Sequence, residues 1–453
     1  MDRPSVSVFV KEKRSKPTNS VRRGHKVCVL GEDVQIREEI LEKFCYQEIS
    51  SRAYDLLTIA GAVAYADRVC KRRRTHGWRR NLHLLVPVHQ SRFWKSEQTG
   101  KALIDVLVFL TGDNWSFEFR PRARQVGFLT KQKTLNLETS QPIVLPSSHG
   151  LDSFVHSMLL RSERPKNEIV RVLTKNPSFG EAPDLGAILE LQVPIHVRTT
   201  GGESTYRSRS FLFYAVAGTA SAMVKGSTVS IPENGQGSLG PSLVIDGNEW
   251  PYRGSHPGFT KLLGTLLSLV FDRSLSFEHP RIWNTKGEML NALRRLGSEK
   301  GWEQTRSCPR DQRDLRYSGS RIQCGICGGC LLRRMALNAA GLQGQEQYYW
   351  DDLGKPDADS SLILGSRRKT RKNDMDIFLS NALAMNRLSE MASTAGTNAR
   401  VRQVGYEIAV ATGDDLKSTL ERLHGLIEKH SHEWTSFVGQ LPRESWVRRT
   451  CFI

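Results

Sequence analysis

The chain has 453 residues, more than one ordinary domain core accommodates, and this length predicts about two to three domains. No apolar run approaches the ~20 residues that a membrane helix needs, and the first residues, MDRPSVSVFVKEKRSK, lack the apolar core of a secretory signal. We therefore expect a cytoplasmic protein with no membrane segment. The net charge of +18 predicts an anionic partner, which can be nucleic acid, a phosphorylated ligand or an acidic protein.

Residues 1–135 have the pattern of an amino-terminal α/β domain. Strand-like segments at 25–30 and 83–88 flank residues 54–74, whose apolar positions recur at helical spacing. A second helix is expected at 101–110, and residues 115–122 alternate like a strand with one buried face. The arginine-rich stretch 68–80 around Trp78 either binds nucleic acid by phosphate contacts and stacking or is the solvated end of a helix.

Residues 136–305 alternate strand-like and helix-like segments, and this pattern predicts an α/β fold with a doubly wound parallel sheet. Strands are expected at 143–145, 168–173 and 194–199, with helices at 153–162 and 184–191. Residues 306–350 hold a cysteine-rich subdomain, and 351–374 combine Gly, Pro, Ser and dense charge, as a linker does. A helical region is expected at 375–453, with one apolar stripe formed by Leu416, Leu420, Leu423 and Ile427.

The loop PSSHGLDS at 146–153 follows a buried strand and precedes a helix. Such a loop presents backbone N–H groups and a helix dipole to an anion, so it is a candidate phosphate cradle. Ser148 and Ser153 supply hydroxyl donors, and Asp152 can cap the helix or orient Mg²⁺. The same residues are also those of an ordinary helix cap, so the loop alone leaves both interpretations open.

Four of the eight cysteines crowd a short segment, while the other four are scattered. Four soft thiolates are the set that a tetrahedral structural Zn²⁺ site requires, and loose reduced cysteines are the alternative. A ferredoxin-type iron–sulfur run would need another cysteine where the chain has Arg333 and Arg334. A site closed by four protein ligands is architectural. The clustered residues are Cys308, Cys324, Cys327 and Cys330.

Short motifs that follow the loop occur in the order found in the QueC family of PP-loop ATPases, which make 7-cyano-7-deazaguanine, and the chain resembles that family over about residues 140–335. The additional amino-terminal domain and helical tail resemble QatC, the QueC-like family of bacterial Qat anti-phage defence systems. The motifs are YRSRSFLF (206–213), IPENG (231–235), SHP (255–257), NTKGEM (284–289), RSC (306–308) and CGICGGCLLRR (324–334).

The resemblance implies a HUP-like PP-loop fold with ATP, Mg²⁺ and Zn²⁺ as cofactors. Asp152 and Lys286 would be catalytic, while Glu233, Asn234 and His256 would bind substrate. Other interpretations stay open, because Asn-Gly forms turns and because a histidine before proline can be structural. The guanidinium groups of Arg207 and Arg209 and the ammonium group of Lys286 suit phosphate binding, although such side chains can also be merely exposed to solvent. The residues implied to bind the nucleotide are Ser148, His149, Gly150, Leu151, Asp152, Ser153, Arg207 and Arg209.

The loop departs from the family at His149, where a glycine is usual, and Ser147 is an additional residue before it. If this position required positive φ, His149 would be strained by ~1 kcal/mol. The SHP stretch also lacks the family's flanking threonines. These departures leave open whether the loop is active.

The resemblance implies an enzyme that adenylates a 7-deazaguanine carboxylate and transfers the acyl group to an amine. The acceptor implied is an amino group on a protein partner from the same defence system (QatB-like), and an α-amine suits this role because its pKa is near 7.7–8.0. The alternatives are an ordinary 7-cyano-7-deazaguanine synthase that uses ammonia, a catalytically impaired nucleotide-binding scaffold and a nucleic-acid-binding module.

Overall fold

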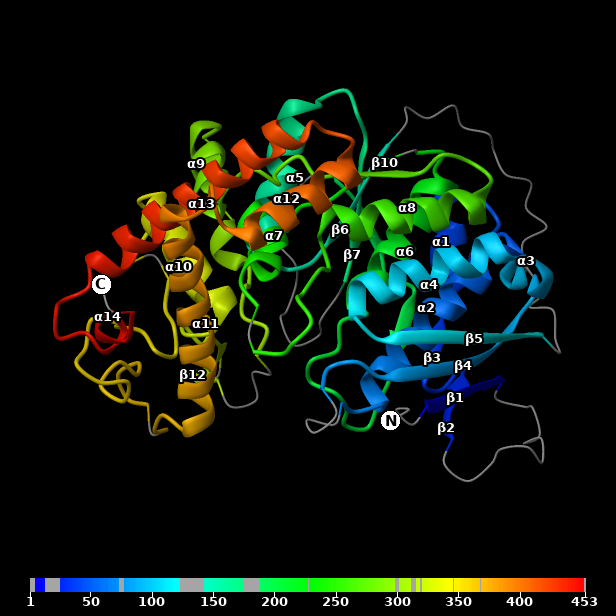
Figure 1. Cartoon of the computed structure of the whole chain (residues 1–453), viewed down its shortest axis with the longest axis horizontal. Coiled ribbons are helices and arrows are strands. Elements are labelled where there is room, and N and C mark those ends of the chain that lie inside the picture. The colour runs from blue at the N-terminus through cyan, green and yellow to red at the C-terminus, as the bar shows by residue number, and fades with distance from the viewer. Residues whose placement is uncertain are drawn as a thin grey trace.

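The computed structural model describes residues 5–12, 25–72, 77–122, 142–174, 188–226, 228–245, 247–297, 301–310, 315–317, 320–344, 346–366 and 368–451. These residues form an elongated molecule with an amino-terminal sheet at one end (Figure 1). Helices α11 (Lys372–Glu390) and α14 (Trp446–Cys451) lie at the other end. No helix among the described residues is long and apolar enough to cross a membrane.

The amino-terminal sheet consists, within the described residues, of β1 (Ser5–Glu12), β2 (Lys26–Leu30), β3 (Val34–Ile36), β4 (Asn81–Val88), β5 (Asn114–Pro121) and β9 (Ile195–Val197). Its strand order is β5-β4-β1-β2-β3-β9, and β9 alone runs antiparallel to its neighbour. Residues of β4 alternate between buried and partly buried, because only one face of this strand packs on the core. Its helices are α1 (Glu38–Cys45), α2 (Ser51–Val69), α3 (Ser91–Lys95) and α4 (Glu97–Thr111).

The second sheet is parallel throughout and contains five described strands: β6 (Ile143–Ser147), β7 (Ile169–Leu173), β8 (Leu189–Gln192), β10 (Thr228–Ser230) and β11 (Ser276–Glu278). Its order is β11-β10-β6-β7-β8, so the chain reverses direction across the sheet between β6 and β10. In sheets of this kind, ligands bind beyond the carboxyl ends of the strands at such a reversal. The associated helices are α5 (Leu151–Glu163), α6 (Arg209–Met223), α7 (Gly235–Leu243), α8 (Pro257–Phe271) and α9 (Lys286–Arg295).

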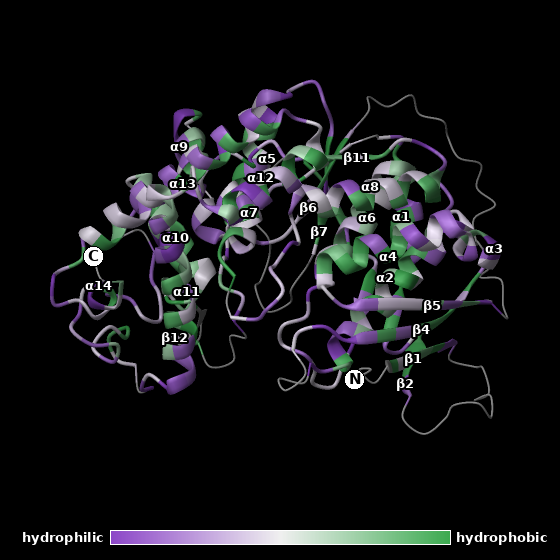
Figure 2. Cartoon of the chain, viewed as in Figure 1, coloured by the Kyte–Doolittle hydropathy of each residue, from purple (hydrophilic) through white to green (hydrophobic). Residues whose placement is uncertain are grey.

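The two sheets share one apolar core through the helices between them. Helix α2 packs against α6, and α4 packs against α8. Figure 2 shows apolar residues concentrated in these inner helices. Ala60 of α2, Val216 of α6 and Leu267 of α8 are fully buried in one cluster with Val8 of β1. The amino-terminal sheet and the second sheet are therefore joined by a shared core of helices.

The carboxyl-terminal half is mainly helical. It contains the short hairpin β12 (Arg316–Tyr317) and β13 (Ser320–Arg321), and the helices α10 (Gly328–Ala339), α12 (Ala399–Thr412) and α13 (Leu416–Gly439) in addition to α11 and α14. On the predicted stripe of α13, Leu423 and Ile427 are buried, whereas Leu416 is exposed. The predicted linker 351–374 is rich in turns but packs on this region, since Ser361 is fully buried and accepts a hydrogen bond from Trp446 Nε1.

The elements expected before residue 175 are present, and three of the expected elements up to residue 199 need correction. The helix expected at 54–74 ends at Val69, because the next residues turn toward a buried ion cluster. The helix expected at 184–191 lies partly outside the described residues, and its last part is strand β8; a short apolar run does not distinguish helix from strand by periodicity. The strand expected at 194–199 is present as β9 but joins the amino-terminal sheet through β3. The domain boundaries remain predictions.

Candidate functional site

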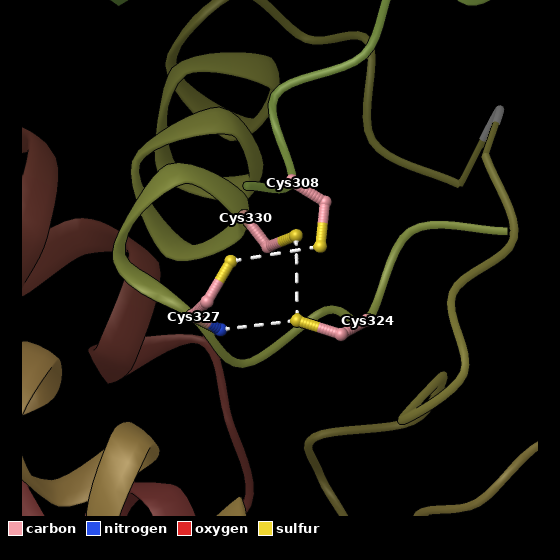
Figure 3. A group of neighbouring side chains, drawn as sticks. All are labelled: Cys308, Cys324, Cys327 and Cys330. Atoms are coloured by element: carbon pink, nitrogen blue, oxygen red, sulfur yellow. Dashed lines mark hydrogen bonds between the residues drawn. The ribbon is translucent and has the colours of Figure 1, made fainter. Parts of the chain in front are cut away.

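The four clustered cysteines form a possible metal site (Figure 3). Their sulfur atoms all lie within 4.8 Å of one another, and all four residues are buried. The Sγ atoms of Cys324 and Cys330 are 3.7 Å apart, and those of Cys327 and Cys308 are 3.8 Å apart. These separations exclude disulfide bonds, which need about 2.05 Å, and they match the edge of about 3.8 Å of a sulfur tetrahedron with metal–sulfur bonds of about 2.3 Å.

The start of α10 brings these cysteines together. Cys327 is the N-cap of α10, and Cys330 lies in its first turn. A side-chain carbon on Gly329 would lie 2.2 Å from the carbonyl oxygen of Ser307, so only glycine lets the helix approach the segment that carries Cys308. Burial raises the pKa of the Cys330 thiol, whereas hydrogen bonds from the neighbouring cysteines lower the pKa of Cys324. The cluster thus favours a thiolate at Cys324 even before a cation adds its charge.

The arginines that follow the cysteines are structural. Arg333 is fully buried, and its Nη2 donates to Glu346 Oε1 at 2.6 Å and to the Trp302 carbonyl oxygen at 3.1 Å. Arg334 stacks on Tyr348, with its guanidinium carbon 3.8 Å from the ring centre. These contacts fix the first turns of α10, and with them the positions of Cys327 and Cys330.

The predicted phosphate loop lies at the carboxyl end of β6, beside the reversal point of the parallel sheet. The N–H of Gly150 donates to Ser148 Oγ at 3.1 Å, and the N–H of Ser148 donates to Ser153 Oγ at 3.2 Å. Serine hydroxyls therefore occupy two of the donors that a phosphate would use. Helix α5 begins at Leu151 with no side-chain cap, which leaves its amino-terminal turn as the anion-attracting end of the loop.

His149 is not strained, contrary to what a left-handed backbone at this position would impose. Tyr46, Lys225 and Asp272 are the described non-glycine residues with positive φ, and Gly150 has φ −76°. His149 is buried, and its carbonyl oxygen accepts a hydrogen bond from the N–H of Arg306 at 2.7 Å. The loop therefore has a backbone conformation that a histidine adopts without cost.

Asp152 joins the starts of three helices. Its Oδ2 accepts from Lys286 Nζ at 2.6 Å, and its Oδ1 accepts from Asn234 Nδ2 at 2.8 Å. Asp152 lies in the first turn of α5, Asn234 is the N-cap of α7, and Lys286 is the first residue of α9. Both residues of the ion pair are buried, with side-chain exposures of 6% for Lys286 and 12% for Asp152. The ammonium and carboxylate charges of this pair balance each other, while the helix amino termini that meet here add partial positive charge.

A cavity of about 180 Å³ opens beside this constellation. Ser148 and Ser153 line it from the loop, Arg209 from the start of α6 and Glu233 from the segment between β10 and α7. The cavity thus collects residues that the sequence places far apart, at the edge where the sheet topology predicts a ligand. The side chains that complete its wall include Thr174, Phe213, Tyr214, Tyr252 and Ser255.

Glu233 is the titrating group of the cavity. Burial and the nearby charge of Asp152 raise its pKa from 4.5 to about 7, and the charge of Lys286 partly opposes this effect. Two carboxyl groups that share one site resist being ionised together unless a cation joins them. Glu233 and Asp152 therefore offer a proton site or, with oxygen ligands, a divalent-cation site.

Two predicted residues lie outside this constellation. Arg207 is not among the residues that line the cavity. Its Nη2 pairs with Glu249 at 2.8 Å, and its guanidinium carbon lies 4.8 Å from the ring centre of Trp78. His256 is fully buried as the N-cap of α8, where its Nδ1 accepts from the N–H of Gly258 at 3.0 Å. Burial lowers the pKa of His256 to about 3. This histidine is neutral and caps the helix, and its substrate-binding role stays a prediction.

Asn234 caps α7, since its Oδ1 accepts from the N–H of Gly237 at 3.0 Å while its Nδ2 contacts Asp152. Leu151 is buried in the core beneath the loop and contributes packing. The motifs do not include Gln236, Tyr214 or Glu433. Gln236 directly follows IPENG and Tyr214 directly follows YRSRSFLF, whereas Glu433 is brought near only by tertiary contacts.

The arginine-rich stretch at 68–80 is largely internal where it is described. Arg80 Nη2 contacts both Asp67 and Asp113, and Arg72 Nη2 pairs with Asp113 at 2.7 Å. Trp78 Nε1 donates to the carbonyl oxygen of Thr111 at 2.7 Å. These groups are used within the fold, while Arg73 and Arg74 lie outside the described residues.

No protein-family model matches the chain, and neither a curated protein nor a solved structure matches it. The resemblance to the QueC family therefore depends on the short motifs alone.

Proposed function

We propose that this chain is a QueC-like, ATP-dependent enzyme of anti-phage defence that adenylates a 7-deazaguanine carboxylate and transfers it to an amine. One observation carries the proposal: Asp152, Asn234 and Lys286 converge beside a cavity at the reversal point of a parallel sheet. Phosphate binding favours helix amino termini with cationic side chains nearby, and here the starts of α5, α7 and α9 meet beside Lys286 and Arg209. The motifs in family order supply the reaction class.

Each residue of the constellation suits one part of this chemistry. Lys286 and Arg209 would stabilise charge on the phosphates, and the amino-terminal turn of α5 would add backbone donors. Asp152 and Glu233 carry the carboxylate oxygens that Mg²⁺ prefers, and the ion would supply neutralisation of phosphate charge. A substrate carboxylate oxygen would attack the α-phosphorus with loss of pyrophosphate, after which an amine would attack the acyl carbon with loss of AMP.

The size of the cavity limits how a nucleotide would bind. Pockets that enclose a drug-sized ligand have about 300–1,000 Å³, whereas this cavity has about 180 Å³. It accommodates one part of a nucleotide or a flat heterocycle. The remainder would lie along the exposed side of the cavity, where Arg209 and Tyr252 are both exposed.

We propose that the metal bound by the cysteine cluster is a structural Zn²⁺ ion. Four buried thiol groups at tetrahedral spacing favour this soft-ligand, closed geometry, with no position left for a substrate. Pure protein should contain one zinc per chain by elemental analysis, and chelation should lower the thermal midpoint. Folded protein without zinc would contradict this identification.

The acceptor amine is proposed to be the amino terminus of a partner protein of the same defence system. An α-amine, with a pKa near 7.7–8.0, is partly neutral at cellular pH, whereas a lysine amine near 10.4 is almost fully protonated. A docked partner would replace dilute ammonia with an amine at high effective concentration. The net charge of +18 suggests that the docking surface of the partner is acidic, so association should weaken with salt.

Calorimetry with ATP and Mg²⁺ tests the nucleotide site directly. Lys286→Ala should weaken binding by about tenfold or more, because it removes a buried cation at the proposed phosphate position. Lys372→Ala is the matched control, because it removes a lysine whose side chain is 89% exposed on α11. No binding to wild-type protein at millimolar ATP, with partner and deazaguanine present, would contradict the proposal.

Mass spectrometry of a co-purified partner tests the transfer step. After incubation with ATP, Mg²⁺ and 7-carboxy-7-deazaguanine, the partner should carry a deazaguanine adduct on its first residue. The adduct should be absent with Asp152→Ala. An unmodified partner together with free nitrile product would instead indicate the ordinary synthase reaction with ammonia.

A nucleotide-binding scaffold without turnover is the second candidate, and the loop itself favours it. The N–H groups of Ser148 and Gly150 are already bonded to serine hydroxyls, and Asp152 is already paired with Lys286. A scaffold would bind ATP and partner but release no pyrophosphate. A pyrophosphate-release assay with the partner present therefore distinguishes the two candidates.

A further inference from the structure

We propose that helix α13 of the carboxyl-terminal region positions Lys286, and that Glu433 is the side chain through which it acts. This inference rests on the proposed function, because that function gives Lys286 its role. Glu433 does not line the cavity, so it is a positioning residue. Two hydrogen bonds lead from its carboxylate through Gln236 to the backbone N–H of Lys286.

One face of α13 lies against the starts of α7 and α9. Leu426, His430 and Glu433 follow the i, i+4, i+7 spacing of a single helix face. A side-chain carbon on Gly235 would lie 2.6 Å from Leu426 Cδ2 and 2.1 Å from the carbonyl oxygen of Ile282. Glycine at this position therefore allows α7 to begin in direct contact with α13.

A buried polar network joins this face to the backbone of Lys286. Gln236 Oε1 accepts from the N–H of Lys286 at 2.9 Å, and Gln236 Nε2 lies 3.2 Å from Glu433 Oε2 and 3.1 Å from His430 Nδ1. His430 Nε2 in turn lies 2.9 Å from the carbonyl oxygen of Met385 in α11. Since each of these contacts pairs a donor with an acceptor, the network is satisfied and rigid.

Glu433 also holds the cap of α9. The Thr285 hydroxyl donates to Glu433 Oε1, and the same hydroxyl accepts from the N–H of Glu288 at 3.0 Å in a capping box. A side-chain carbon on Gly287 would lie 2.5 Å from Glu433 Oε1 and 2.8 Å from Ala339 Cβ. The first turn of α9 is thus wedged between α13 and α10, with Lys286 at its tip.

These contacts fix where the ammonium group can reach. The backbone N–H of Lys286 donates to Gln236, the residue before it donates to Glu433, and the residue after it lies so close to Glu433 that a side-chain carbon would clash there. The side chain then extends to Asp152 Oδ2. Without the Glu433 carboxylate, Gln236 and Thr285 lose a shared acceptor, and the turn that carries Lys286 loosens.

The test is the rate at which an amine-acylating reagent modifies Lys286 in the full chain, read by mass spectrometry of the digested protein. In the wild type this rate should be low, because the amine is buried and paired, and Lys372 serves as the exposed internal reference. Glu433→Ala should raise the relative rate at Lys286 at least fivefold. Glu433→Gln keeps one acceptor oxygen and should restore most of the protection.

Ser389→Ala is the matched control, because it removes the contact between Ser389 and Ser431 that joins α11 to α13 away from Lys286. It should leave the rate at Lys286 unchanged. Equal rates in wild type, Glu433→Ala and the control would overturn the inference, as would equal increases in Glu433→Ala and Ser389→Ala. The labelling readout needs no nucleotide, so it stands even if ATP fails to bind and the proposed function is wrong. If ATP binds, Glu433→Ala should also weaken its affinity, and Ser389→Ala should not.

Discussion

A buried aspartate lies near the carboxyl ends of parallel strands in each of the two sheets, and the two aspartates have opposite surroundings. Asp55 of α2 accepts from the backbone N–H groups of His89 and Gln90 and from the rings of His89 and Trp94, at 2.8 to 3.2 Å. Asp152 of α5 instead meets an ammonium group and an amide, with a second carboxyl group and a cavity beside it. Asp55 is surrounded by hydrogen-bond donors of the fold, whereas Asp152 shares an ion pair with Lys286 beside an open cavity.

This difference indicates that Asp55 stabilises the fold, whereas Asp152 can also take part in ligand binding. The donors to Asp55 all belong to the short segment 89–94. The partners of Asp152 begin two different helices. An anionic ligand can take the place of Asp152 as the partner of Lys286, and a cation can take the place of Lys286 as the partner of Asp152. Stability and ligand binding should therefore respond differently at the two aspartates.

The largest effect is expected from Asp55→Ala. The substitution leaves several buried donors without an acceptor, and it should lower the free energy of unfolding by about 3–5 kcal/mol. Urea unfolding measures this change. Asp376→Ala, which breaks an exposed pair on α11, is the control and should change it by less than about 0.5 kcal/mol. A loss below about 1 kcal/mol at Asp55 would remove its assignment as a structural residue.

A smaller and reversible loss is expected at Asp152. Asp152→Ala leaves the Lys286 ammonium buried and unpaired, so it should cost about 3 kcal/mol. The double variant Asp152→Ala/Lys286→Met removes both charges and should recover most of that loss while ATP binding stays absent. Urea unfolding and calorimetry on the same samples provide the two readouts. Recovery of nucleotide binding together with stability would show that the pair is only structural.

The pH dependence of stability should identify the second carboxyl group. Burial raises the pKa of Glu233 from 4.5 to about 7, so its stabilising contribution is complete below about pH 4.5 and is lost as the pH rises through about 7. Compared with Glu233→Gln, the wild type should therefore lose stability between about pH 5 and about pH 7, by at most about 1.4 kcal/mol per pH unit. Parallel stability curves for the two proteins across this range would contradict the assignment.

The sequence predicted the elements whose pattern is local. Alternation in 83–88 and 115–122 predicts strands that the structure contains as β4 and β5, and the spacing CxxCxxC predicts a cluster that a helix start assembles. The strand at 189–192 could not be predicted in this way, because its apolar residues are too few to define a period and because pairing with β7 decides its conformation.

The candidate site was predictable only where short motifs carry it. Asp152, Asn234 and Lys286 stand in such motifs, and the structure brings them together. Glu433 has no motif, since its partners Gln236 and Thr285 precede it by 197 and 148 residues. Arg207 is the opposite case, because its motif position predicts phosphate binding. In the structure, its guanidinium pairs with Glu249 and stacks on Trp78.

The smallest effect is expected from His149→Gly, which restores the glycine of the resembled loop. Because His149 does not have positive φ, glycine relieves no strain there, and it increases the entropy of the unfolded chain. The substitution also removes a buried ring, so stability should fall by about 1 kcal/mol, and ATP affinity should stay within about twofold. Urea unfolding and calorimetry check both values, with His149→Ala as the control that keeps a side-chain carbon. A gain in stability together with much tighter ATP binding would mean that the histidine blocks the loop, and the scaffold without turnover would then become the better description.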